Sequence, residues 1–180
     1  DGDVHTAPII EALMAGRFEA LKIKGGTFVL NLGEGRAETL TAVDVEALNR
    51  RRSGIQLKGA ADIRGFRHTF DLQIGAAGDK KPAANVPVKA SIKGVLFSGT
   101  LDGRLSNTGA IEIQGALEGM VADVNQAARA FGFAASGVAL GELKIKSRLD
   151  WTRGTLAFDK ATFQLGGNEG TGAMSLSVGG

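Results

Sequence analysis

Apolar and polar residues alternate along most of this chain. Successive side chains of a β-strand point to opposite faces, so alternation gathers the apolar side chains on one face of a sheet. Strands that are buried on one face only are typical of antiparallel sheets. The pattern therefore predicts a mainly β protein, with an antiparallel sheet of about ten strands of ordinary length. The alternating segments are residues 21–23, 28–32, 55–58, 70–74, 86–93, 111–114, 143–146, 163–165 and 174–178.

Glycine-containing pairs mark the turns expected between these strands. The apolar positions are odd before Gly25-Gly26 and even after it. A two-residue hairpin turn would explain this shift, because glycine accepts the positive φ angles of tight turns. Asp102-Gly103 and Arg153-Gly154 are predicted to form similar turns. Residues 75–82 are predicted to form a long loop.

Two segments follow a helical period instead. Residues 6–15 are predicted to form a short helix that Thr6 caps and Gly16 ends. Residues 121–131 have apolar side chains at helical spacing and are followed by Gly132, which predicts a second short helix. Residues 42–48 contain helix formers as well as valines in alternation, and we predict a strand there.

Composition and charge narrow the class of protein. The 180 residues are 43% hydrophobic, which favours a single domain over residues 1–180 with a real core. Lys plus Arg number 21 against 19 acidic residues. Such a small surplus argues against a nucleic-acid partner. Cysteine is absent, and no segment approaches the roughly 18 apolar residues of a membrane helix. From its ends we expect the chain to be a segment of a longer protein, with any membrane anchor outside it.

Residues for catalysis or metal binding do not cluster in the sequence. The two histidines, His5 and His68, are far apart, and we expect both to be exposed. The glycine-rich residues 166–172 lack the lysine and the following helix of a phosphate-binding loop, so a β-turn is the better interpretation. We expect no enzymatic activity, no cofactor and no metal site.

The apolar sheet face is larger than two short helices can cover. The sheet must therefore fold on itself, pair with neighbouring segments or leave an apolar groove. A groove of this kind suits acyl chains, because each CH₂ group that is buried contributes about 0.8 kcal/mol.

The order of these motifs resembles that of AsmA-like proteins over nearly the whole chain. After the first helix, residues 21–30 (LKIKGGTFVL), 54–59 (GIQLKG) and 70–75 (FDLQIG) carry the resemblance. Residues 109–119 (GAIEIQGALEG) lead into the second helix, and residues 143–172 follow, with FQLGG at 163–167. The resemblance implies an elongated, curled β-sheet with an apolar groove or a partly closed roll. It also implies a periplasmic module of an inner-membrane-anchored protein that takes part in phospholipid transport or outer-membrane assembly. No catalytic residues carry over.

The candidate lipid-groove residues are apolar side chains at alternating strand positions. Ordinary core packing is the alternative for each of them, and for any single one it is favoured. Another alternative is a closed sheet whose edges bind another envelope protein by strand addition. A glycan hydrolase is the least favoured. The candidates are Phe28, Leu30, Ile55, Leu57, Phe70, Leu72, Ile92, Ile113, Ile145, Leu149 and Phe163.

Overall fold

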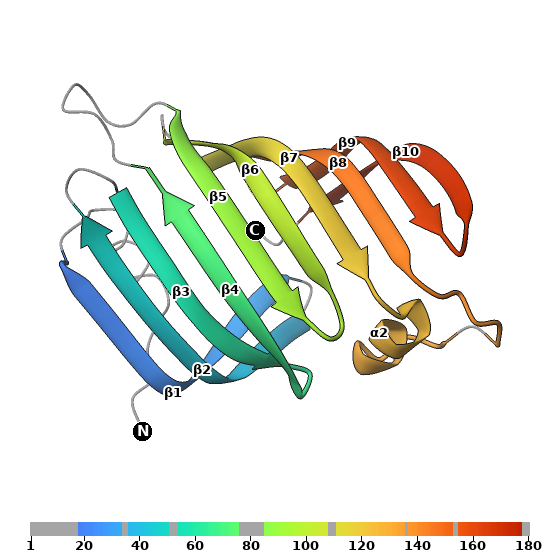
Figure 1. Cartoon of the computed structure of the whole chain (residues 1–180), viewed down its shortest axis with the longest axis horizontal. Helices are drawn as coiled ribbons and strands as arrows, with labels where there is room; N and C mark the ends of the chain where they lie inside the picture. Colours follow the sequence, from blue (N-terminus) through green and yellow to red (C-terminus); the bar gives the residue numbers. More distant parts are fainter. Residues whose placement is uncertain are drawn as a thin grey trace.

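The computed structural model describes residues 18–33, 36–50, 54–75, 85–107, 111–135, 137–152 and 155–177. These residues form one antiparallel sheet in which the strands lie side by side in chain order (Figure 1). The mainly β, antiparallel architecture and the expected strand number are thus confirmed. The strands are β1 (Ala20–Gly33), β2 (Arg36–Arg50), β3 (Gly54–Ile63), β4 (Phe66–Ile74), β5 (Val86–Gly94), β6 (Ser98–Asn107), β7 (Ile111–Val121), β8 (Leu143–Thr152), β9 (Thr155–Leu165) and β10 (Asn168–Ser177).

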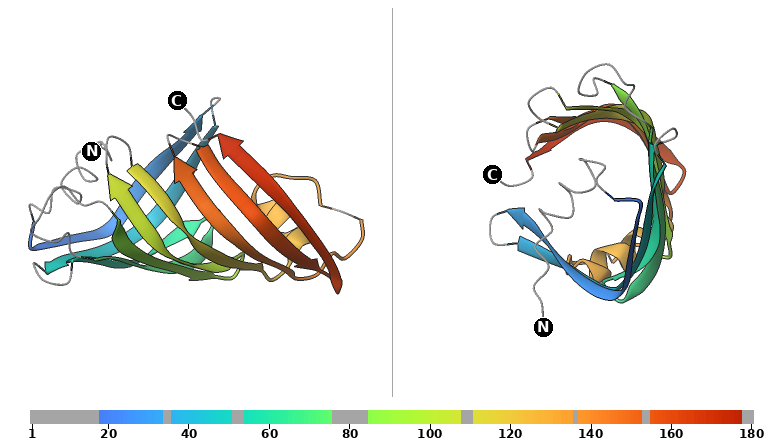
Figure 2. Two further views of the ribbon diagram at one scale, coloured as in Figure 1. Left: turned by 90° about the horizontal axis from the view of Figure 1, so that it is seen from above. Right: turned by 90° about the vertical axis from the view of Figure 1, so that its left-hand side faces the viewer.

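The sheet is strongly curved but not closed. Figure 2 shows it as an open curl, with β1 and β10 at its two free edges. Extensive contacts among the described elements join only strands that are neighbours in the sheet. Each strand is thus held in the sheet by its hydrogen-bonded neighbours.

One helix, α2 (Val124–Ala130), follows β7 and lies on the concave side of the sheet (Figure 2). It begins later than the sequence predicts, because β7 continues to Val121 and Asp123 forms the N-cap. The Asp123 side chain accepts a hydrogen bond from the Gln126 N–H at 2.9 Å. The predicted end is confirmed, since Gly132 has a φ of +78° directly after the last turn. The predicted helix over residues 6–15 lies outside the described residues.

The predicted hairpin turn at Gly25-Gly26 is wrong. Both residues lie inside β1, where the register against β2 shifts on either side of Gly26. The apolar phase therefore changes at a β-bulge, which inserts an extra residue without reversing the chain. Gly25 has a φ of +61°, and its N–H donates to Asp44 Oδ1 at 3.1 Å.

The predicted turn at Asp102-Gly103 is also wrong, because both residues lie within β6. Gly103 faces Gly115 of β7, and the two strands approach closely there. A Cβ added to Gly103 would lie 2.2 Å from the carbonyl oxygen of Gln114. The glycine is thus needed for close packing of two strands and not for a turn.

Other expectations agree with the structure or fall outside it. Residues 42–48 belong to β2, as expected. Of the predicted turn over residues 166–172, Gly166-Gly167 form the turn between β9 and β10, whereas the remaining residues belong to β10. The predicted turn at Arg153-Gly154 falls between β8 and β9, on residues that lie outside the described part. Most of the predicted 75–82 loop and His5 lie outside it too.

Candidate functional site

The strand register places the candidate groove residues on one face of the sheet. Residues that lie directly opposite each other in an antiparallel pair point to the same face of the sheet. Following these pairs from strand to strand places all the candidates on one face, which we call the apolar face. Phe70 of β4, for example, lies opposite Ile92 of β5, and Ile145 of β8 lies opposite Phe163 of β9. The remaining pairs that link the candidates to this face are Phe28–Leu40, Leu30–Glu38, Leu40–Ile63, Ile55–Ile74, Leu57–Leu72, Gly59–Phe70, Leu105–Ile113 and Gly115–Leu149.

This apolar face is the concave one. His68, on the same face of β4 as Phe70, stacks against Phe97 with ring centroids 4.5 Å apart. Phe97 in turn lies 6.4 Å from the ring of Phe131, the C-cap residue of α2. Because α2 lies inside the curl (Figure 2), the face that carries these rings lines its inside.

The large apolar side chains of this face are not packed away as in an ordinary core. Leu149 is buried at 9% exposure, but the other candidates with described side chains are only half-buried. Trp151 and Met174 share the face, and both are exposed. The side chain of Leu30 is outside the description. Most of the buried core consists of small or medium-sized residues: Val43, Ala47, Ala61, Val86, Val88, Leu96, Leu105, Leu149 and Ala161.

The expectation that His68 is exposed is wrong, since its side chain is fully buried. It occupies an apolar-face position, and its Nδ1–H donates to the carbonyl of Phe66 at 2.8 Å. Opposite it lies Gly94, where an added Cβ would come within 2.0 Å of the imidazole. The glycine thus leaves the space for the ring, which alternation alone on β4 could not reveal.

The convex face is polar, and several of its charged side chains form ion pairs across neighbouring strands. Cross-strand ion pairs join Lys58 to Asp71 at 3.3 Å and Lys146 to Glu118 at 3.0 Å. Arg67 contacts Asp44 at 2.8 Å and Asp62 at 3.2 Å. Such exposed pairs contribute little each. The charged side chains nevertheless make this face polar, in contrast to the apolar concave face.

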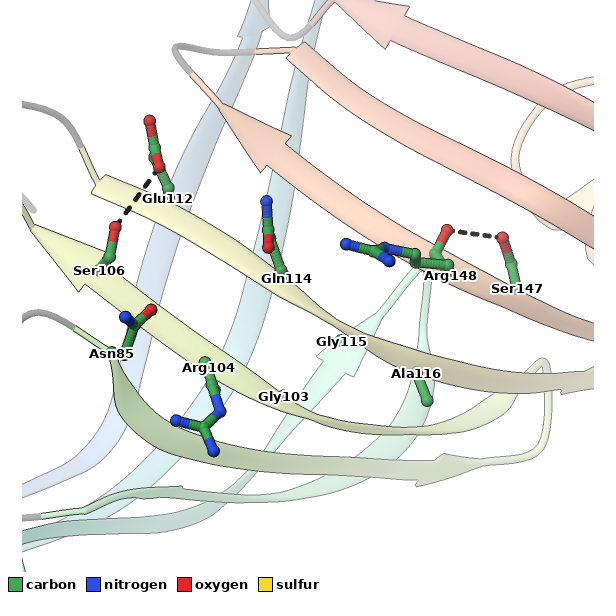
Figure 3. A pocket seen from close by; sticks show the side chains of 10 residues that line it. All are labelled: Asn85, Gly103, Arg104, Ser106, Glu112, Gln114, Gly115, Ala116, Ser147 and Arg148. Atoms are coloured by element: carbon green, nitrogen blue, oxygen red, sulfur yellow. Dashed lines mark hydrogen bonds between the residues drawn. The ribbon is translucent and has the colours of Figure 1, made fainter.

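A hollow of about 550 Å³ lies on this polar face, over β6, β7 and β8 (Figure 3). Gln114 lines it, one residue from Ile113 and therefore on the opposite side of the sheet. Its two cationic side chains are those of Arg104 and Arg148. Arg148 contacts Asp150 at 3.3 Å, and the carboxylate of Glu112 also lines the hollow. No sequence pattern indicated this hollow. Its polar side chains are Asn85, Arg104, Ser106, Glu112, Gln114, Ser147 and Arg148.

In the part of the chain that the structure describes, no three His, Asp or Glu side chains gather as a metal site would require. None of its helices has the length and apolar character to cross a membrane. Comparison with protein-family models, with curated proteins and with solved structures gives no significant match.

Proposed function

We propose that this chain is a non-catalytic module that binds the acyl chains of lipids along its concave face. One observation carries the proposal: an apolar face that spans the ten strands lines an open curl, and most of its large side chains are only half-buried. A face of this extent normally marks a site that another molecule covers. Each CH₂ group covered there would contribute about 0.8 kcal/mol, so a long acyl chain supplies ample free energy.

The resemblance of the motif order to that of AsmA-like proteins supports a cellular location and a biological role for this module. We propose that residues 1–180 form a periplasmic segment of an inner-membrane-anchored protein, which binds phospholipid and contributes to its transport or to outer-membrane assembly. The groove then runs along the inside of the curl. Its walls include Phe70, Ile92, Ile145 and Phe163, which lie in one line across β4, β5, β8 and β9.

Native mass spectrometry with lipid extraction, on chain purified from a bacterial envelope, tests this proposal. The wild-type chain is expected to carry phospholipid. Ile113→Asp places a charge on the concave face, where it would have to be desolvated beside an acyl chain, and should abolish the bound lipid. Gln114→Asp is the matched control, because the neighbouring residue lies on the convex face and is exposed.

Circular dichroism and thermal melts establish that both variants fold. If folded Ile113→Asp retained as much lipid as Gln114→Asp, the concave face would not be the lipid site. A wild-type chain that is free of lipid, and stays so when mixed with phospholipid vesicles, would contradict the proposal as a whole.

A second candidate function rests on the edge strand β10. Its residues 168–175 are all exposed, it contains no proline, and Glu169 is its one charged residue. Its register against β9 shifts once, between Gly172 and Met174. Edge strands are usually protected by charge, proline or bulges. Residues 168–172 of β10, which precede this shift, therefore offer a regular edge to a strand of another envelope protein. Crosslinking from a photoreactive residue at Thr171 would capture that partner, whereas the lipid proposal requires no such adduct.

A further inference from the structure

Three exposed apolar side chains lie on the connections at one end of the curl, next to α2. Phe133 is 68% exposed, Val138 is 69% exposed and Val95 is 60% exposed. They come from two separate connections, Val95 from the one between β5 and β6 and the other two from the one between α2 and β8. We call this part of the molecule the α2 end, and define it as residues 95–97, α2 and residues 131–142 without Ser136.

Contacts hold these segments together. The Asn125 side chain, on α2, donates to the carbonyl of Val138 at 2.8 Å. The Phe133 N–H donates to the carbonyl of Ala128 at 2.8 Å. Phe97, two residues after Val95, lies against Phe131. The three apolar side chains are therefore presented by one assembly.

The exposed apolar side chains of the α2 end do not belong to the buried core. α2 has no buried residue, and this end contacts the rest of the protein through the rings of Phe97 and Phe131, which lie against His68 and Arg64 respectively. The core of the protein thus does not account for the exposed Phe and Val side chains. Exposed aromatic and aliphatic side chains next to basic residues are a feature of helices and loops that lie in the lipid interface.

The charges at this end fit an anionic surface. Arg129 and Lys93 are exposed, and no carboxylate in the described part of the chain lies within ion-pair distance of either. The acids nearby are engaged: Glu38 pairs with Arg64 at 2.6 Å, and Glu142 pairs with Lys144 at 2.8 Å. Asp123 caps α2.

We propose that the α2 end docks on the surface of an anionic phospholipid bilayer, with Phe133, Val138 and Val95 entering the headgroup region. The biological purpose of this docking rests on the proposed function, because docking brings one end of the apolar concave face to the membrane. The docking itself is a separate property of separate residues, none of which is among the groove candidates.

Flotation with vesicles of phosphatidylethanolamine and phosphatidylglycerol tests the docking. The wild-type chain is expected to float with them. Removing the Phe133 contribution with Phe133→Asp should weaken vesicle partitioning by about tenfold or more. Gln114→Asp is the matched control, because Gln114 is exposed on the convex face near the start of β7, whereas α2 follows the other end of that strand. Its partitioning should be unchanged. Arg129→Gln should lower partitioning by about fivefold on these vesicles and have no effect on phosphatidylcholine vesicles.

Val95→Asp, on a different connection, repeats the test should Phe133→Asp fail to fold. A wild-type chain that stays out of the vesicle fraction would overturn the inference, as would Phe133→Asp and Val95→Asp that float as well as Gln114→Asp. Lipid extraction from the same preparations separates the two proposals. If vesicles bind the wild type but its extract holds no lipid, the groove fails and the docking stands. If Phe133→Asp loses vesicle binding but retains co-purified lipid, both stand.

Discussion

Asp44 and Arg67 hold the bent part of β2 through individual polar contacts. The register between β2 and β3 shifts between Thr41 and Asp44, and Ala42 there has a φ of +48°. Arg67 Nη1 donates to the carbonyl of Ala42 at 2.6 Å, and Nη2 donates to Asp44. The N–H of Gly25, above all, and then the guanidinium of Arg67 hold the pKa of Asp44 below its ordinary value of 3.8.

Asp44→Asn should therefore lower the stability of the chain at neutral pH. A carboxyl whose pKa is lower in the folded state stabilises that state above its unfolded pKa, and the contribution is lost as pH falls through the folded pKa. The difference in melting temperature between wild type and Asp44→Asn should thus shrink as the pH is lowered below 3.8. Thermal melts at a series of pH values measure it. Glu46→Gln, at an exposed position on the same strand, is the control, and an equal effect of both would refute the role of Asp44.

His68 is a second residue whose importance the structure reveals. Its ring is fully buried between Gly94 and Phe97. His68→Ala leaves a cavity at this point and should lower the free energy of unfolding by about 2–4 kcal/mol. Thr69→Ala, at the next and exposed position, should cost less than about 0.5 kcal/mol. Urea unfolding followed by circular dichroism compares the two, and similar midpoints would contradict the packing role of the imidazole.

Among the elements, β6 and β7 show how glycine shapes the inside of the curl. Gly115 and Gly103 face each other, and a Cβ on Gly115 would lie 2.6 Å from the carbonyl oxygen of Asp102. Four residues later on the same strand and face, a Cβ on Gly119 would have its nearest neighbour at 3.9 Å. A side chain larger than hydrogen would therefore fit at Gly119 but not at Gly115.

Gly115→Ala is accordingly expected to lower the free energy of unfolding by about 1–3 kcal/mol, because the two strands must separate. Gly119→Ala should be neutral or stabilising by up to about 1 kcal/mol, since alanine restricts the unfolded chain. Denaturant unfolding of both variants decides the matter. Equal losses would mean that strand approach at Gly103 and Gly115 is not the constraint.

At the scale of the whole molecule, an open apolar curl should be stabilised by what fills it. A ligand that binds only the folded state raises stability in proportion to the logarithm of its concentration over its dissociation constant. Removal of co-purified lipid should therefore lower the melting temperature, and added phospholipid should restore it. Ile113→Asp should show no such response, while Gln114→Asp should behave as the wild type. A melting temperature indifferent to lipid would contradict occupancy of the curl.

The alternation of apolar and polar residues was sufficient to predict the antiparallel sheet, most of its strands and the common face of the groove candidates. It did not predict β6, which contains none of the alternating segments. These features depend on local geometry, because the pleat alone decides to which side each side chain points. Candidates as far apart in sequence as Phe28 and Phe163 thus share one face.

Features that depend on residues distant in sequence were decided by the tertiary structure alone. Gly25 lies in a bulge because Asp44 accepts its N–H, and Gly103 lies within a strand because Gly115 faces it. His68 is buried because Gly94 on the next strand leaves room for its ring. The side toward which the sheet curls, and hence the concave position of the apolar face, likewise follows from contacts between strands. The alternation of apolar and polar residues along a single strand does not indicate which contacts that strand makes with its neighbours.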